Sequence, residues 1–244
     1  MQIEVAEAFE IARAGAADQV LISAEHASNR LPAGWRWPAA DQRLITSHWA
    51  WDPGVRELSL ELAELLSTTA VLARFTRLLA DPNRPEGHPE LFRQQADGAA
   101  VELNQDISDA GALQRLSTYH RPYHQALSDA VRDSRAALCF SIHSYTPVYQ
   151  GQVRELEVGV LYNREEALAT SLMHHLQRHG HDTQLNEPYS GKAGLIYSVE
   201  RAAERHGRRA LEIEVRNDLL LDSSRRGQLA EQLAAWLSGA QLAL

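Results

Sequence analysis

Two histidines follow apolar stretches that lie far apart in the sequence. His26 comes after QVLISAE, and His143 comes after AALCFSI. Both stretches are rich in aliphatic and β-branched residues, which is typical of buried strands. Because the carboxyl ends of parallel strands meet over one edge of a sheet, we expect the two imidazoles to lie close together. Two imidazoles and one carboxylate, with a position left for water, form a known arrangement for catalytic zinc.

Asp52, in SHWAWDPG, is the best candidate for the carboxylate of such a site. It lies between aromatic residues and a Pro-Gly turn, directly before a predicted helix. An aspartate in this position is also a good N-cap, and the local sequence alone favours capping. Glu25 is a second candidate, but neighbours along an extended strand point to opposite faces. Either Glu25 or His26 is therefore expected to face away, unless the strand has already ended.

Two further arrangements of histidines have helical spacing. His48 precedes Asp52 by four residues, and His120 precedes His124 by the same interval. On a helix, either pair would share one face. The second pair lacks the glutamate of the usual zinc-protease helix motif, and Pro122 interrupts it. We therefore expect no metal at this second pair, and we expect His124 to line the pocket.

A long polar stretch, residues 81–106, contains prolines and shows little periodicity. A loop of this length in a compact protein is usually functional. It begins with DPNR, which is either an ordinary turn or a site where Arg84, oriented by Asn83 and Asp81, binds a substrate carboxylate. Arg77 adds a second positive charge nearby. In an acidic protein, this cluster indicates a small anionic ligand.

The stretch EIEVRND alternates apolar and charged residues near the end of the chain. In a strand, Glu212, Glu214 and Arg216 would share one face. This face is either a solvated face of an edge strand or a row of carboxylates beside a metal-bound water. In the second case, Glu214 is a candidate general base.

Strands and helices alternate along the chain, which predicts an α/β protein. Several segments have apolar residues at intervals of three or four, which predicts helices with one buried face. Several predicted strands are apolar throughout, which favours a mostly parallel sheet covered on both faces. We expect a single domain over residues 1–244. The predicted strands are residues 19–24, 70–75, 136–142, 158–163 and 209–215, and the predicted helices are residues 55–66, 112–134 (with a kink or a new start at Pro122), 165–179, 198–206 and 223–242.

Composition and charge exclude several kinds of partner. The net charge of the 244 residues is -8, so the chain has no basic field for nucleic acid. We find no secretory signal at the start and no apolar run of transmembrane length, so no membrane partner is expected. Cys139 is the one cysteine, in an apolar stretch, and fits a reducing cytoplasm. The sequence does not determine the oligomeric state.

With these motifs assembled, the chain resembles the N-formylglutamate amidohydrolase family. The matching stretches run in order from Glu25 to Leu219. The first of them differs from the Pro-His-Ser-Gly-like motif of the characterised enzymes, which places the chain in a separate branch of the family. The stretches are EHASNRLP, HWAWDPG, FTRLLADPNR, YHRPYH, SIHSYTP, NEPYSG and EIEVRNDL.

The resemblance implies a fold and a set of site residues. The family is similar to zinc carboxypeptidases and aspartoacylases, which implies a three-layer α/β/α fold around a mixed sheet. It implies one zinc ion, Zn²⁺, held by His26, Asp52 and His143, so that Asp52 is a ligand rather than a cap. Asn83 and Arg84 resemble a pair that binds the substrate carboxylate, and Glu214 resembles the general base. Tyr189 and Ser190, in NEPYSG, resemble a mobile segment that lines the pocket.

The resulting hypothesis is a zinc-dependent amidohydrolase that removes an N-acyl group, formyl first among candidates, from an acidic amino acid such as glutamate. Arg77 is expected to stabilise the developing oxyanion. Two alternatives remain at this point. One keeps the zinc and changes the substrate to a peptide or another N-acyl amino acid. The other is a binding protein for a small carboxylate without catalysis.

Overall fold

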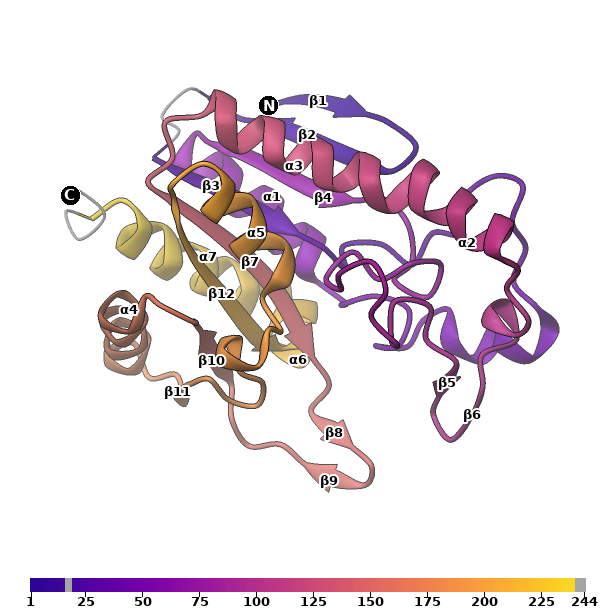
Figure 1. Ribbon diagram of the computed structural model, residues 1–244. Helices are drawn as coiled ribbons and strands as arrows, with labels where there is room; N and C mark the ends of the chain where they lie inside the picture. The colour runs from indigo at the N-terminus through magenta and orange to yellow at the C-terminus, as the bar shows by residue number, and fades with distance from the viewer. Residues whose placement is uncertain (16–18, 240–244) are drawn as a thin grey trace.

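The computed structural model describes residues 1–15 and 19–239. One sheet of eight strands forms its centre, in the order β1-β2-β4-β3-β7-β12-β10-β11 (Figure 1). The strands are β1 (Gln2–Val5), β2 (Phe9–Arg13), β3 (Val20–Ala24), β4 (Thr69–Ala73), β7 (Leu138–Tyr145), β10 (Val158–Leu161), β11 (Thr183–Leu185) and β12 (Arg209–Arg216).

The sheet is mixed and mostly parallel, as predicted. β4, β3, β7 and β12 are parallel neighbours, and β10 pairs in parallel with β11. Antiparallel pairs join β1 to β2, β2 to β4, and β12 to β10. The carboxyl ends of β3, β4, β7 and β12 therefore lie at one edge, where the polar residues of the sequence gather.

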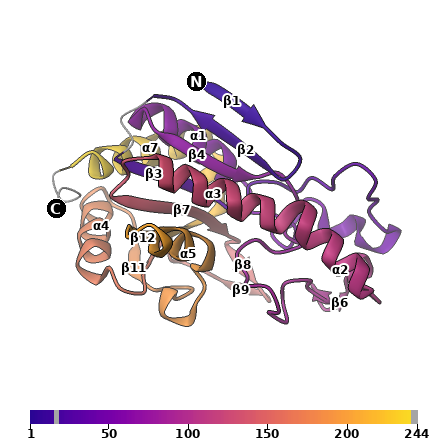
Figure 2. The same cartoon turned by 45° about the horizontal axis from the view of Figure 1, so that its top comes forward.

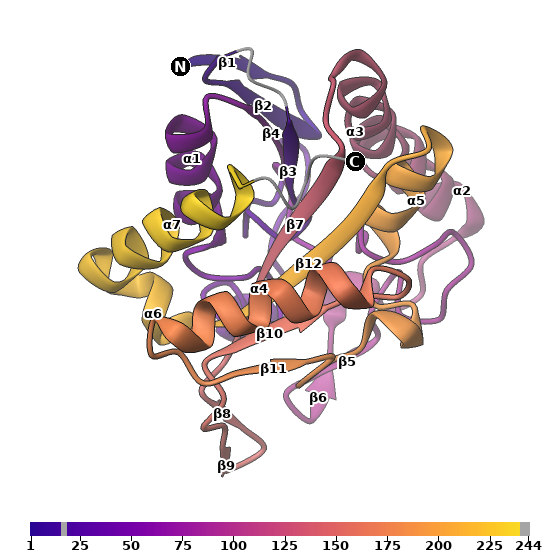
Figure 3. The ribbon, with the colours of Figure 1, turned by 90° about the vertical axis from the view of Figure 1, so that its left-hand side faces the viewer.

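Helices cover both faces of the sheet and give three layers. Figure 3 shows α1 (Val55–Leu66) and α7 (Ser223–Leu237) on one side, with α3 (Arg121–Asp133) and α5 (Tyr197–Arg205) on the other. α4 (Glu166–Arg178) packs with α7 and β10 in the first layer. Successive strand residues alternate between the two cores: Ile22 packs in the core under α1, α4 and α7, and Leu21 packs in the core under α3 and α5.

The five predicted strands are present, and the differences have local causes. β1, β2 and β11 were not predicted; β1 is fully exposed and β11 has three residues, so neither gives a strong apolar run. β7 continues through His143 to Tyr145 instead of ending at Ile142, because its last residues pair with β12. The helix predicted for residues 223–242 ends at Leu237, and residues 240–242 lie outside the described residues.

Residues 109–133 form one long helical segment that contains Pro122, and Figure 2 shows its two labelled parts, α2 (Asp109–Arg115) and α3. α2 leads into a π-helical turn (Leu116–His120), and α3 follows with the proline in its first turn. His120 and Arg121 keep right-handed helical dihedral angles, so the backbone stays helical up to the proline, and the π-helical turn lies directly before the residue that lacks an N–H donor.

Two short hairpins extend beyond the carboxyl end of β7. β5 (Gln95–Ala96) and β6 (Ala99–Ala100) form the first, inside the long polar loop, and β8 (Val148–Tyr149) and β9 (Gln152–Val153) form the second. Figure 1 shows both at the same end of the molecule. Among the residues described, no helix is long and apolar enough to cross a membrane. The remaining short helices are η1 (Ala39–Leu44), η2 (Glu102–Asn104), η4 (Gly191–Ala193) and α6 (Asn217–Leu221).

Candidate metal centre

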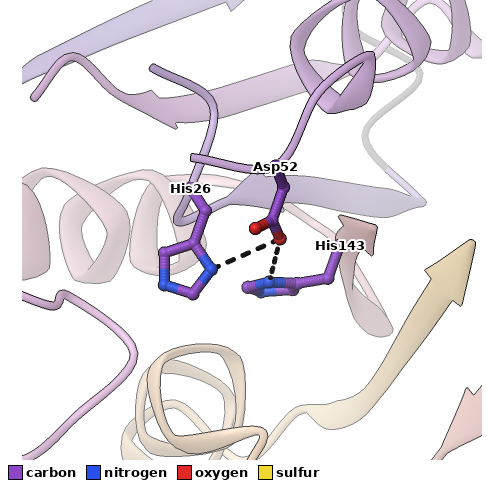
Figure 4. A group of neighbouring side chains, drawn as sticks. All are labelled: His26, Asp52 and His143. Atoms are coloured by element: carbon purple, nitrogen blue, oxygen red, sulfur yellow. Dashed lines mark hydrogen bonds and ion pairs between the residues drawn. The ribbon is translucent and has the colours of Figure 1, made fainter. Parts of the chain in front are cut away.

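Both imidazoles turn toward one carboxylate oxygen (Figure 4). Oδ2 of Asp52 lies 3.3 Å from Nδ1 of His26 and 3.0 Å from Nδ1 of His143. His26 follows β3, His143 lies within β7, and Asp52 comes from the loop before α1. All three residues are buried. Elements that are distant in sequence thus bring three potential ligand atoms within 4.8 Å of one another.

The second ring nitrogen of each histidine meets a further carboxylate. Nε2 of His26 lies 2.8 Å from Oδ1 of Asp81, and Nε2 of His143 lies 3.0 Å from Oε2 of Glu25. Carboxylates in this position fix the ring orientation and tautomer of metal-bound histidines. β3 ends at Ala24, so Glu25 and His26 lie beyond the strand, which is the exception that the sequence left open. Both side chains point into the centre, and Glu25 supports the histidine of β7.

Glu25 is held by two hydroxyl donors. The Tyr123 hydroxyl donates from α3 at 3.1 Å, and the Ser141 hydroxyl donates from β7 at 2.6 Å. Burial raises the pKa of this carboxyl group, but the hydrogen bond and the charge of His143 outweigh burial and lower the pKa to about 2. Glu25 is therefore an anion at physiological pH, although it is fully buried.

Asp52 is not the N-cap of α1, so the capping interpretation is wrong. The cap position belongs to Gly54, whose φ of +83° is left-handed, and a Cβ atom there would meet Leu220 at 2.4 Å. The turn points the Asp52 carboxylate back toward the strands. There it accepts the backbone N–H of Ser144 at 3.2 Å, while its own N–H donates to the carbonyl of His26 at 2.9 Å.

Glu212 and Glu214 extend the cluster along β12. Glu214 is the register partner of His143, and Glu212 lies 3.4 Å from Nε2 of that histidine. Both glutamates are buried, because β12 lies between β7 and β10; the alternative of a solvated edge strand is wrong. Burial raises the pKa of Glu214 to about 8, and the pKa of Glu212 is also raised. Oε2 of Glu214 has no hydrogen-bond partner among the described residues.

The spacing of these groups is compatible with a metal ion held by the three side chains. Metal–nitrogen bonds of about 2.0–2.1 Å place neighbouring ligand atoms roughly 3.3 Å apart, and the donors around Asp52 Oδ2 lie at 3.0 and 3.3 Å. The charges fit as well. A cluster with this many buried carboxyl groups is stabilised by a cation, because burying charges of one sign is costly. The buried carboxyl groups are Glu25, Asp52, Asp81, Glu212 and Glu214.

A cavity of about 300 Å³ opens over this cluster. His26, Asp52, His143 and Glu214 form part of its wall. The predicted residues Arg77, Asn83, Arg84 and Tyr189 also line it. The cavity therefore combines the potential metal ligands with two of the predicted guanidiniums.

Arg77 is anchored by the carboxylates that support the histidines. Its Nη2 donates to Oδ2 of Asp81 at 2.7 Å, and its Nη1 lies 3.6 Å from Oδ1 of Asp52. Burial opposes the charge, but Asp81 and Asp52 raise the pKa of Arg77 above its usual value. Asp81 thus orients His26 and Arg77 together, whereas the sequence had suggested that it orients Arg84.

Arg84 and Asn83 differ in how much of their hydrogen-bonding capacity is free. Nε of Arg84 is buried without a hydrogen-bond partner in the described part of the chain, and its Nη1 donates to the Asn83 carbonyl. The Asn83 side chain is engaged by the backbone: it donates to Leu195 and accepts from Ser198, at 2.8 and 3.0 Å. Asn83 therefore joins the loop to the start of α5, and Arg84 is the better anion donor.

Two predicted substrate-binding residues are not brought to this cavity. His124 on α3 lines a separate cavity together with His120, which directly precedes that helix, and a hydrogen bond joins the His124 ring to the backbone of Pro82. The ring of His124 instead lies 5.6 Å from that of Tyr197 on α5. Among the described residues that line the cavity over the metal centre, Tyr189 of NEPYSG is present and Ser190 is not.

Sequence reasoning missed several residues around the cavity. Arg154 lies over the rings of Tyr145, Tyr149 and Tyr189, at 5.3, 4.6 and 5.6 Å from their centroids. Arg93 lines the cavity and lies 5.2 Å from the Trp49 centroid. Both arginines come from irregular segments, where no periodic pattern marks a side chain as inward-facing. The tyrosines that precede Arg154 in the sequence were only a weak indication that this arginine lies near the site.

Comparison with known proteins identifies the relatives of the chain. The family model described as N-formylglutamate amidohydrolase matches residues 18–221. The structure of a gene product from Agrobacterium tumefaciens is similar, with 28% identity, a TM-score of 0.90, and coverage of 97% of this chain and 95% of that one. A structure named N-formylglutamate amidohydrolase, from Ralstonia eutropha JMP134, is 20% identical, with a TM-score of 0.74 and coverage of 95% and 96%. Among curated proteins, none matches the chain.

Proposed function

Because the chain belongs to the N-formylglutamate amidohydrolase family, we propose that it is a zinc-dependent hydrolase acting on the N-acyl amide of an acidic amino acid. N-formyl-L-glutamate, which would give formate and glutamate, is the first candidate substrate. The observation that carries the proposal is the meeting of His26, Asp52 and His143 in one cavity with Glu214.

His26, Asp52 and His143 would hold the zinc ion, which activates water and polarises an amide carbonyl when it is bound. Glu214 is the proton carrier of the proposal. It faces the same cavity, and one of its oxygens has no partner in the described structure. A carboxyl group whose pKa is raised to about 8 by burial can accept a proton from water and return it to the leaving nitrogen near neutral pH.

The two guanidiniums of the cavity have separate tasks. Arg77 is fixed beside Asp52 by its bonds to Asp81, so it presents positive charge close to the reacting carbonyl and stabilises the oxyanion. Arg84 lines the cavity, its Nε has no hydrogen-bond partner among the described residues, and its guanidinium is the group that binds the substrate carboxylate in this proposal. Fixing the carboxylate also fixes the position of the amide.

The decisive test couples metal analysis to product release. We expect about one zinc ion per purified chain, and formate release from N-formyl-L-glutamate that stops with a chelator and returns with zinc. Bound zinc without hydrolysis of any N-acyl amino acid would support a binding protein instead. Hydrolysis of other N-acyl amino acids but not of the formyl compound would keep the chemistry and replace the substrate.

The role of Arg84 has its own prediction. Arg84→Ala removes hydrogen bonds to a charged group, each worth about 1.5–3 kcal/mol, so KM should rise roughly 10–100-fold with little change in kcat. Steady-state kinetics measure both constants. Arg164→Ala is the control, because Arg164 is an exposed arginine remote from the cavity lining. An unchanged KM would remove Arg84 from the proposal.

We place the activity in a reducing compartment, the cytoplasm. The supporting observation is Cys139, which is free and buried in β7. Burial raises the pKa of its thiol to about 12, so the thiol is unreactive. The chain thus has no cysteine chemistry that depends on an oxidising environment.

A further inference from the structure

A second and larger hollow adjoins the central cavity. Its volume is about 810 Å³, compared with about 300 Å³ for the cavity over the metal centre. It lies between the two hairpins, since residues of β5–β6 and of β8–β9 both line it. We call this hollow the hairpin groove. The residues that line it but not the cavity are Pro89, Gln94, Gln95, Ala96, Asp97, Gly98, Val148, Gln150 and Gly151.

The cavity and the hairpin groove are adjacent, because five residues line both of them. The shared residues are His48, Trp49, Glu90, Arg93 and Tyr149. The His48 ring lies 4.7 Å from that of Trp49 and 6.1 Å from that of Tyr149, which makes a small aromatic cluster at the junction. Nε2 of His48 is buried and has no hydrogen-bond partner among the described residues.

The two spaces differ in chemistry. The cavity wall includes the guanidiniums of Arg77 and Arg84, which suit carboxylates. Gln95 and Gln150 line the hairpin groove, together with Gln94, whose amide already bonds to Phe92 and Gln105. Amide groups both donate and accept hydrogen bonds, and so they complement an uncharged polar chain. A peptide backbone has this character.

The aromatic junction favours a peptide over a sugar chain. Sugars bind to open aromatic faces, but the Trp49 ring already has the Arg93 guanidinium 5.2 Å from its centroid. Arg93 in turn pairs with Glu90 at 2.9 Å, so the two charges at the junction compensate each other. One face of Trp49 is therefore occupied, and the charges of Arg93 and Glu90 compensate each other.

The residues that line the two spaces also indicate which end of the substrate would enter the hairpin groove. Asn83, Arg84 and Tyr189 line the cavity and are not among the described residues of the hairpin groove. The carboxylate that Arg84 binds therefore stays in the cavity. The part of the substrate that enters the groove is then the part on the other side of the amide, which is the acyl part.

We propose that the physiological acyl group is a short peptide that occupies the hairpin groove, so that the enzyme releases an acidic amino acid from the carboxyl end of a peptide. This inference rests on the proposed function and deepens it. In the reaction, water adds OH to the carbonyl carbon and a proton to the nitrogen as the C–N bond breaks, which gives a peptide carboxylate and a free acidic amino acid. Pockets of roughly 300–1,000 Å³ hold ligands larger than a formylated amino acid, and contacts remote from the reacting bond accelerate the reaction.

The test is a substrate series that extends one side at a time. We expect kcat/KM to rise at least about tenfold from N-formyl-Glu to N-acetyl-Ala-Glu and N-acetyl-Ala-Ala-Glu, because the added residues bind in the groove. N-formyl-Glu-Ala-Ala, extended on the carboxyl side, should show no gain. A flat series, or a gain only with the carboxyl-side extension, would overturn the proposal.

Two paired valines, one inside the hairpin groove and one outside it, allow a test variant and a matched control. Val148 on β8 is half exposed and lines the groove, and Val153, its partner on β9, is exposed and outside the described lining of both spaces. Val148→Trp should fill the groove and lower the ratio of kcat/KM between N-acetyl-Ala-Ala-Glu and N-formyl-Glu several-fold. Val153→Trp should leave this ratio unchanged. Equal ratios in both variants would contradict a groove-bound peptide.

Calorimetry separates failure of the groove from failure of the proposed function. If no compound is hydrolysed, the proposed function fails, and binding to the zinc-loaded protein still tests the groove. N-acetyl-Ala-Ala-Glu should then bind at least about tenfold more tightly than N-formyl-Glu, a difference of about 1.4 kcal/mol, with the advantage reduced by Val148→Trp. Equal affinities would overturn the groove proposal even if hydrolysis of N-formyl-Glu is found.

Discussion

The central histidine pair, His26 and His143, and the helical pair, His120 and His124, differ more in their surroundings than in their geometry. The ring centroids of His26 and His143 are 4.7 Å apart, and those of His120 and His124 are 4.4 Å apart. In the central pair, the outer nitrogen of each ring meets a carboxylate. In the helical pair, bonds go to backbone carbonyls, and His120 Nδ1 and His124 Nε2 lack a partner among the described residues.

Opposite pKa shifts follow from this difference. Burial lowers the pKa of His124 to about 3, with a further contribution from the neighbouring His120. Burial acts in the same direction on His143, but Glu212, Asp52 and Glu25 outweigh it and raise the pKa. Proximity of two imidazoles is therefore insufficient for a metal site. The carboxylates around them determine whether the site stabilises a cation.

The strongest test of this comparison removes one histidine from each pair. His143→Asn should abolish zinc binding and lower kcat/KM roughly 10³-fold, because several kcal/mol of transition-state stabilisation depend on the metal. His124→Asn should leave the zinc content unchanged, since the amide can donate near the position of Nδ1. Metal analysis and kinetics measure both. Loss of zinc in the His124 variant would break the distinction between the pairs.

A second prediction separates proton transfer from metal binding within the central cluster. Glu214→Gln keeps the shape of the side chain but removes its ability to carry a proton. We expect kcat to fall roughly 10²–10⁴-fold, with the zinc content retained. Equal kcat values for the variant and the parent protein would exclude Glu214 as the proton carrier.

The same variant predicts a stability gain in the metal-free protein. Burial raises the folded-state pKa of Glu214 to about 8. Below the unfolded-state pKa of about 4.3, the side chain is protonated in both states and does not reduce the free energy of unfolding. As the pH rises from there toward 8, the free energy of unfolding falls, because only the unfolded state ionises readily. Gln has no such dependence. Thermal unfolding with a chelator should therefore show Glu214→Gln to be more stable by about 2–3 kcal/mol near pH 7, and by less near pH 5. A constant difference across this range would contradict the pKa shift.

The smallest expected effect concerns the support of His143. Glu25→Gln should weaken zinc binding roughly 10–100-fold, because carboxylates behind metal-bound histidines raise their basicity and fix their orientation. Glu86→Gln is the matched control, since Glu86 lines the cavity of the helical pair and bonds to Arg121. Competition with a chelating dye gives both affinities. Equal losses in the two variants would mean that the support of His143 is not specific.

Much of the fold and part of the site were predictable for the same reason. Apolar runs mark β3, β4, β7, β10 and β12, and alternation with helices indicates parallel strands whose carboxyl ends share one edge. This is enough to bring His26 near His143. The position of Asp52 could not be predicted in this way, because its local sequence fits a helix cap. The positive φ of Gly54, which redirects the chain, leaves no periodic pattern in the sequence.

The sequence by itself determined the alternation of strands and helices, the family, and the histidines that follow apolar runs. These features depend on local periodicity and on residue type. Only the tertiary structure decided that Glu25 supports His143, that Asp81 supports His26 and Arg77, and that Glu212 and Glu214 are buried. The physical reason is that each of these contacts depends on which strands are neighbours and on the direction of a side chain beyond a strand end, and neither is encoded within a short stretch of residues.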